Sequence, residues 1–261
     1  MPATYAHYRF GQQALAGLSP ELQKTAKTYS RLYDAGLHGP DPLFYHSILR
    51  RDQLGALASR YHRIPGKELF EGICTRLRQA PEKPDVAYLF GLLTHYCLDS
   101  LCHPLIIRLD GEGQCPHSEL ETEFDRFLLT LDGEQTPHTR DLGAHLHPDN
   151  GELAVMARCF PPATAAQLGR CMRNMTWATR ILCGKGLLPR GLLERIIPIA
   201  GETARQQLMP RTPSPRAKAF DEPLLQLYDQ ALERFPALAK QLEEHLYQGT
   251  PLGEAFAPIM G

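Results

Sequence analysis

The chain has 261 residues, of which 28 are Lys or Arg and 29 are Asp or Glu, and 43% are hydrophobic. No apolar run approaches the ~18 residues that suggest a membrane-spanning helix, so we expect no transmembrane segment. The net charge of −1 gives no general attraction to nucleic acid or to an anionic membrane. We therefore expect no stable nucleic-acid complex, and any polyanion must be recognised by a local site.

The first ten residues, MPATYAHYRF, lack the basic start and the apolar stretch of about 7–15 residues that mark a secretion signal. We therefore expect a cytoplasmic protein. Seven cysteines occur without a CxxC pair, which fits reduced thiols in a core better than a disulfide framework. The sequence does not indicate the oligomeric state.

Helical periodicity dominates the chain and convincing strand alternation is scarce, which predicts an all-α fold. Ser19, followed by Pro20, is typical of a helix start, so a helix should run to about Ala35 and stop at Gly36. Proline and glycine predict loops at 39–42, 81–84 and 210–216, the last a surface loop that can act as a lid. Further helices are expected over 52–61, 66–78, 85–103, 117–131, 150–158, 161–184, 187–198 and 221–234, with a continuation after Pro236 to 247. We expect one multi-helical domain spanning 1–261, with a metal site in 1–125 and with 126–261 completing the core and the cleft.

The expected helix 85–103 is apolar on nearly every side, as in a central helix that is packed all round. It also carries His95, Asp99 and His103, which share one helical face. His95 and Asp99 have Cβ atoms about 5–6 Å apart and can reach one cation, whereas His95 and His103 are separated by about 12 Å of helix rise. Zinc–ligand bonds of about 2.0–2.2 Å cannot span that row. The row therefore predicts a cluster in which Asp99 lies between ions and His103 belongs to a second site.

Two shorter patterns complete the candidate site. His117 and Glu121 lie on one face of the next helix and can join His103 on one ion, although alone they would be typical of a solvated helix start. Asp41 lies in a rigid Gly-Pro-Asp-Pro-Leu-Phe-Tyr-His segment at 39–46. Either His46 or His62 can accompany it, and the sequence alone does not choose. The alternative for all these residues is a hydrogen-bonded core, but burying unpaired His and Asp side chains is unfavourable.

These motifs resemble the bacterial zinc-dependent phospholipase C family, which is related to the fungal single-strand nucleases. The resemblance covers roughly residues 1–125 and is carried by an early histidine, the 39–45 segment, His-Tyr-x-x-Asp-x-x-x-His-Pro at 95–104 and His-x-x-x-Glu at 117–121. It implies an all-helical domain that holds zinc ions in a cleft and hydrolyses phosphodiesters. The spacing of Asp99 and His103 is shorter than in the secreted enzymes and is similar to the family's uncharacterised members without a signal peptide.

The resemblance implies a role for each matching residue. His95, Asp99, Asp41 and a histidine best matched by His62 would hold the first zinc, and Asp99 would bridge to a third ion. The ligands of the second ion would be His103, His117 and Glu121, and those of the third would include His7. The secreted enzymes complete the third site with the α-amine of a leading tryptophan, whereas this chain begins Met-Pro and its one tryptophan is Trp177. The implied complement is therefore two or three zinc ions.

The chemistry that follows is metal-assisted hydrolysis of a phosphoester, with Asp41 orienting or deprotonating the attacking water. Arg9 and Arg63 can bind phosphate or lie on a solvated surface, and Phe44 and Tyr45 can line the pocket or pack. The substrate is a phospholipid or another small phosphoester, and no amphipathic basic helix is evident for docking to a bilayer. Two other hypotheses are a non-catalytic, metal-stabilised binding module and a His-Asp-domain phosphohydrolase. The second needs an adjacent His-Asp pair, which the sequence lacks.

Overall fold

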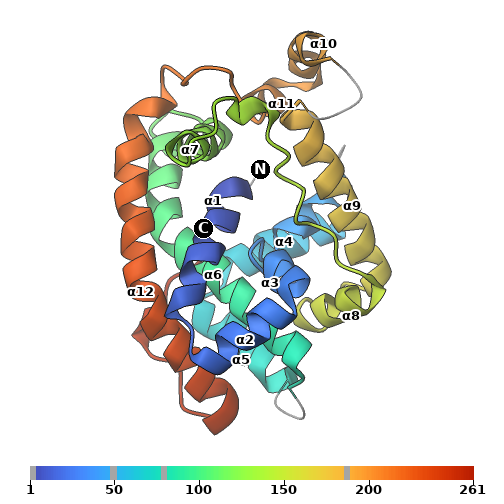
Figure 1. Ribbon diagram of the computed structural model, residues 1–261, viewed down its shortest axis with the longest axis vertical. Coiled ribbons are helices and arrows are strands. Elements are labelled where there is room, and N and C mark those ends of the chain that lie inside the picture. The colour runs from blue at the N-terminus through green and yellow to red at the C-terminus, as the bar shows by residue number, and fades with distance from the viewer. Residues whose placement is uncertain (1–3, 48–51, 78–80, 185–188) are drawn as a thin grey trace.

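The computed structural model describes residues 4–47, 52–77, 81–184 and 189–261 (Figure 1). Within these ranges the chain forms α-helices and short 3-10 turns and has no β-strand, which confirms the all-α prediction. Among the described residues no helix is long and apolar enough to cross a membrane. The α-helices are α1 Thr4–Ala14, α2 Pro20–Thr28, α3 Ser30–Gly36, α4 Gln53–Arg63, α5 Gly66–Leu77, α6 Lys83–Gly111, α7 His117–Leu131, α8 Asn150–Cys159, α9 Ala165–Leu182, α10 Arg190–Ile196, α11 Glu202–Gln206 and α12 Asp221–Gln248.

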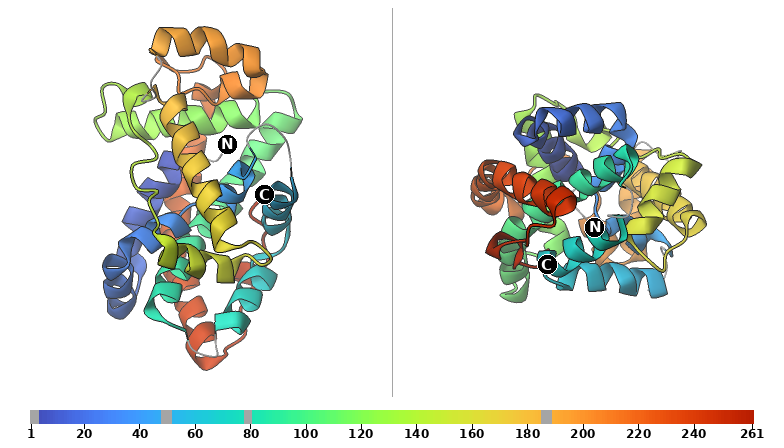
Figure 2. Two further views of the ribbon diagram at one scale, coloured as in Figure 1. Left: turned by 90° about the vertical axis from the view of Figure 1, so that its right-hand side faces the viewer. Right: turned by 90° about the horizontal axis from the view of Figure 1, so that it is seen from below.

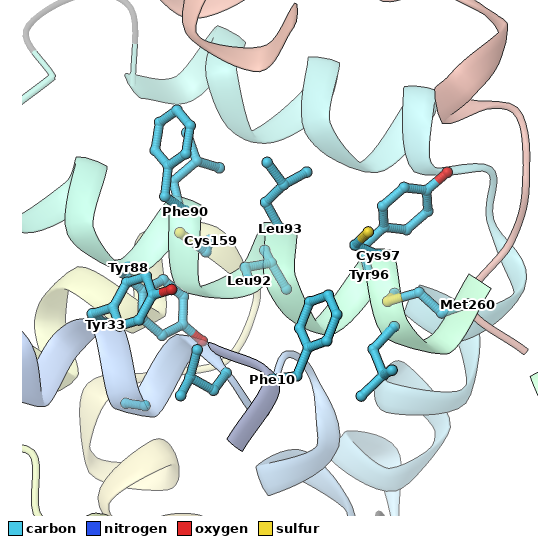
Figure 3. Close-up of a cluster of buried hydrophobic side chains, with 14 of the residues drawn as sticks. Phe10, Tyr33, Tyr88, Phe90, Leu92, Leu93, Tyr96, Cys97, Cys159 and Met260 are labelled. Carbon is cyan, nitrogen blue, oxygen red and sulfur yellow. The ribbon is translucent and has the colours of Figure 1, made fainter. Parts of the chain in front are cut away.

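The centre of the molecule is α6, as its apolar sequence predicts. It packs against α3, α12, α2, α1, α8 and α7, with α12 on one side and α8 and α9 on the other (Figures 1 and 2). Its first half contributes Tyr88, Phe90, Leu92 and Leu93 to a core that also contains Phe10 (Figure 3). All seven cysteines are buried, as expected for core residues. The main core draws on side chains from α1 to the last residues of the chain. The one-domain organisation stays a prediction.

Several helix boundaries differ from the sequence prediction. The first expected helix is two helices, because the chain turns at Tyr29 before α3 begins. Both α6 and α12 continue through an internal proline, Pro104 and Pro236. A proline removes one backbone donor, and the packing of α6 and α12 against each other and against α1 offsets that loss. Helix α1 was not predicted, and the expected helix at 187–198 has its first residues outside the described ranges.

The last residues of the chain pack against the helices that carry the candidate ligands. The amides of Met260 and Gly261 both donate to the carbonyl of His62 at 3.1 Å. Pro258 accepts hydrogen bonds from the Gly66 amide at 2.9 Å and from the Tyr96 hydroxyl at 3.1 Å. The C-terminal end of the chain therefore reaches the region built by α4 and α6.

Candidate metal centre

Three groups of imidazoles and carboxylates converge in the first half of the chain. In each group the possible ligand atoms lie within 4.8 Å of one another. The groups are His7, His95 and Asp99; Asp41, His62 and His95; and His103, His117 and Glu121. Together they contain all eight residues that the sequence singled out. Five elements supply them: α1, the 3-10 turn η2 (Asp41–Tyr45), α4, α6 and α7.

Asp99 lies where the groups meet. Its Oδ1 is 3.1 Å from Nε2 of His7, and its Oδ2 is 3.0 Å from Nε2 of His95 and 3.6 Å from Nδ1 of His103. The imidazoles of His7 and His95 stack with their centroids 4.3 Å apart. Asp99 therefore contacts imidazoles of both the first and the third group, and its role between two ions stays a prediction.

The α1 helix is fixed by a carboxylate of α7. Asp125 accepts hydrogen bonds from the backbone amides of Tyr5 and Ala6, at 3.0 and 2.8 Å. These amides belong to the first turn of α1. The N–H groups of a first helical turn have no acceptor within the helix itself. Asp125 therefore holds the helix that carries His7 against the helix that carries Glu121.

The second group resolves the choice between the two histidines near Asp41. Nε2 of His62 is 3.0 Å from Oδ1 of Asp41, and the Nδ1 of the same ring lies 2.8 Å from the Ala58 carbonyl. His46 instead pairs with Asp52 at 2.5 Å. The structure thus brings His62, and not His46, to Asp41.

The third group is oriented by the end of the chain. Nδ1 of His103 donates to the carbonyl of Met260 at 2.6 Å, which leaves Nε2 facing Glu121 at 3.4 Å. Nε2 of His117 lies 3.1 Å from the same carboxylate. A hydrogen bond from the non-ligating nitrogen fixes the tautomer and direction of a metal-binding imidazole. The Met260 carbonyl is thus a positioning group for His103.

A glycine allows the close approach of His95 to the 39–46 segment. Gly39 has φ of +49°, and a Cβ atom there would lie 2.3 Å from the His95 ring. Only glycine combines this left-handed backbone with the available space. The Gly-Pro-Asp-Pro motif therefore holds Asp41 and leaves room for the imidazole beside it.

Several buried polar atoms of the cluster lack hydrogen-bond partners. They include Oδ2 of Asp41, Nε2 of His95 and Oδ2 of Asp99. The last two are 3.0 Å apart but are not placed to hydrogen-bond each other. Buried polar groups normally have a partner, and leaving one without a partner costs about 1–3 kcal/mol. Imidazole and carboxylate atoms that lie within 4.8 Å of one another are a donor set that a divalent cation can bind, so the donor set fits a metal.

Opposite charges in the cluster shift each other's pKa values. Burial disfavours the charged form of the His103 imidazole, but Asp99 and Glu121 overcome this and raise its pKa to about 10. Burial would also raise the pKa of Asp99, yet His103, His95 and His7 hold it well below its ordinary value. Without metal the His103 imidazole therefore holds a proton while it faces these carboxylates. A cation must displace that proton, so its affinity should increase with pH.

A cavity of about 470 Å³ opens beside the second and third groups. Phe44, which is 39% exposed, and Tyr45 line it, and the Tyr45 hydroxyl is buried without a hydrogen-bond partner. Arg63 also lines the cavity, whereas Arg9 pairs with Asp132 at 2.8 Å and is not part of the lining. The lining residues are Asp41, Phe44, Tyr45, Ser59, His62, Arg63, His103, His117, Glu121, Gln207 and Gly261.

Some residues near the metal centre are not predicted by the sequence patterns. Nε2 of His38 lies 2.7 Å from Nε2 of His145, and the His38 ring is 6.4 Å from the ring of His7. No spacing pattern pairs residues that lie so far apart in the chain, and a backbone carbonyl such as that of Met260 has no sequence signal. The expected lid at 210–216 is fastened instead to α7, since the Ser214 hydroxyl binds Glu119 at 2.5 Å.

Comparison with family models finds no match to this chain, and comparisons with curated proteins and with solved structures find no significant one. The statements that stand are therefore structural. The protein is all-helical, and three groups of buried or half-buried imidazoles and carboxylates can hold metal ions.

Proposed function

We propose that this protein is a metal-dependent hydrolase of phosphoric esters, similar in its chemistry to the zinc-dependent phospholipases C. The observation that carries the proposal is the convergence of eight imidazoles and carboxylates, from five elements, into three adjoining groups beside an open cavity. A buried charge cluster of this size is expensive to fold as a purely structural feature. Adjoining metal sites that border a cavity are typical of enzymes that cleave phosphoesters.

Zinc is the proposed metal, in two or three ions, because mixed imidazole and carboxylate donors suit it. When bound, it would neutralise charge on phosphoryl oxygens and lower the pKa of a water. Asp41 would act as the catalytic carboxylate: its Oδ1 faces His62 and its Oδ2 has no hydrogen-bond partner, so Oδ2 can orient a water or take its proton.

The other cavity residues fit a small anionic substrate. The Arg63 guanidinium can donate hydrogen bonds to two phosphoryl oxygens at once. The Tyr45 hydroxyl stays protonated, because burial and the charges of Asp41 and Glu121 raise its pKa well above the ordinary value, so it can donate a hydrogen bond. Phe44 offers an apolar surface for the organic part of the ester. The proposed substrate class is a phospholipid or another small phosphoester.

The alternative is a helical module that binds metal only for stability. The depth of the ligands favours it, because every residue of the first two groups is buried. The two functions differ in one respect that can be measured. A structural site gives bound metal and a metal-dependent melting temperature, whereas an enzyme also turns over substrate.

The test uses the metal-loaded protein, the chelated protein and the Asp41→Asn variant on a panel of phosphodiesters and phosphomonoesters. The proposal predicts hydrolysis that is lost on chelation, returns with added zinc and is reduced by at least about a hundredfold in the variant. Bound metal without hydrolysis of any substrate would favour the metal-stabilised module. Hydrolysis that survives chelation would contradict both.

A further inference from the structure

Helix α10 and the 3-10 turn that follows it, η4 (Ile197–Ala200), carry apolar side chains on two sides. Leu193 and Ile197 are buried in a small cluster against the end of α9. Leu192, Ile196 and Ile199 face outward and are 42%, 43% and 84% exposed. A surface helix of a globular protein normally turns polar residues outward. The outer apolar side of this segment is therefore a candidate binding surface.

The three exposed aliphatic residues form one ridge. They are spaced four and three residues apart, so their side chains lie on the same side of the segment. The segment stands at one end of the long axis of the molecule, where α10 and α11 project beyond the other helices (Figures 1 and 2). Nothing within the described residues covers this ridge, which we call the apolar ridge (Leu192, Ile196 and Ile199).

The end of the molecule that carries the apolar ridge is formed by a basic stretch of the chain. Residues 189–218 contain six Arg or Lys and two Glu, whereas the rest of the chain contains 22 basic and 27 acidic residues. Arg195 is exposed and lies one turn from Ile199, and Arg216 and Lys218 are exposed further along the chain. The other three arginines pair with Glu194 and Glu202. Among the described residues, no ion-pair partner is seen for Arg195, Arg216 or Lys218.

We propose that the apolar ridge and these three basic side chains dock onto an anionic lipid bilayer. Aliphatic side chains on a projecting segment can enter the boundary between headgroups and acyl chains, while Arg and Lys remain at the level of the headgroups. Each basic residue near an anionic membrane adds to the electrostatic attraction. Charge complementarity favours an anionic bilayer over a second copy of the chain, because two basic surfaces would face each other in a dimer. The proposal does not depend on the metal centre.

Sedimentation with vesicles tests the docking. The probes are large vesicles of phosphatidylcholine alone and of phosphatidylcholine with about 30% phosphatidylserine, at low and at moderate salt. The wild-type protein should sediment with the anionic vesicles and much less with the neutral ones. The triple variant Leu192→Ser, Ile196→Ser, Ile199→Ser should lose at least about tenfold in partition coefficient. Replacing Arg195, Arg216 and Lys218 with Gln should weaken binding to the anionic vesicles and reduce its salt dependence.

Two controls keep the result specific. Ile107→Ser removes from α6 an aliphatic side chain that is 47% exposed, and it should leave vesicle binding unchanged. Asp99→Asn, at the metal centre, should also bind vesicles as the wild type does, so that failure of the proposed hydrolase and failure of docking are distinguishable. The proposal is overturned if the wild type does not sediment with anionic vesicles or if the triple variant binds them equally well. It is also overturned if the ridge instead drives a concentration-dependent dimer, seen by analytical ultracentrifugation, that the triple variant abolishes.

Discussion

Residues 85–103 of α6 are buried except for the half-buried Leu101, and the two halves of this stretch, 85–93 and 94–103, hold different chemistry. The first half packs Phe90, Leu92 and Leu93 into an apolar core (Figure 3). The second half, one turn further along, buries His95 and Asp99 beside further imidazoles. Burial of the first half stabilises the fold directly, at about 25 cal/mol per Å² of apolar surface. Burial of the second half is unfavourable unless something compensates its charges, so the helix combines a stabilising segment with a functional one.

The largest effect should come from removing the charge of the carboxylate that links the groups. Asp99→Asn keeps the shape of the side chain but weakens its contacts with His7, His95 and His103. We expect metal content to fall and hydrolysis to drop by at least about a thousandfold. Elemental analysis and initial rates measure the two effects.

A matched control lies in the other half of the same helix. Asp85 is also buried, caps the first turn of α6 and pairs with Arg158. Asp85→Asn should lower stability and leave the metal content per folded chain unchanged. If both variants lost metal equally, the distinction between the two halves of α6 would be wrong.

The next effect is on stability alone. Leu93→Ala removes a fully buried side chain from the apolar half and should lower the free energy of unfolding by about 2–5 kcal/mol. Urea denaturation of the metal-loaded protein measures this change. Metal content per folded chain should stay at the wild-type value, and its loss would mean that the apolar half also determines the geometry of the ligands.

A smaller effect is expected at the glycine beside His95. Gly39→Ala strains a left-handed backbone and pushes against the imidazole, so metal affinity should fall by about 10–100-fold. The control is Gly55→Ala in α4, where the nearest other atom to a new Cβ is 3.8 Å away. Competition with a chromophoric chelator should show weaker binding in the first variant only. Equal affinities in the two variants would mean that His95 is not a ligand.

The smallest expected change concerns the cavity and not the ligands. Tyr45→Phe removes a buried hydroxyl that has no hydrogen-bond partner, so the fold should be as stable or slightly more stable. If the hydroxyl donates to the substrate, kcat/KM should fall by about tenfold, equivalent to one hydrogen bond. Metal content should not change. An unaltered kcat/KM would assign Tyr45 to packing.

Much of the candidate site was predictable because helical spacing is a local property. The row His95, Asp99 and His103 and the pair His117 and Glu121 follow from residues four apart on one face. Helical spacing does not choose the partner of Asp41, since His46 and His62 are both near it in sequence and the choice depends on how α4 packs; only the family resemblance favours His62.

The remaining features depend on contacts between distant parts of the chain. The Met260 carbonyl reaches His103 only because the end of the chain folds back against α4 and α6. Helix α1 has a weak pattern of its own and is fixed by Asp125 from α7. The continuation of α6 and α12 through prolines reflects tertiary packing that outweighs local propensity. The sequence therefore indicates the ligands better than the groups that orient them.

The most direct test of the account is the metal content of the protein purified without added metal, measured alongside its melting temperature before and after chelation. The account predicts two or three equivalents of zinc per chain, a lower melting temperature once the metal is removed, and recovery when zinc is restored. A chain that carries no stoichiometric metal, and whose melting temperature does not respond to chelation or to added zinc, would contradict it.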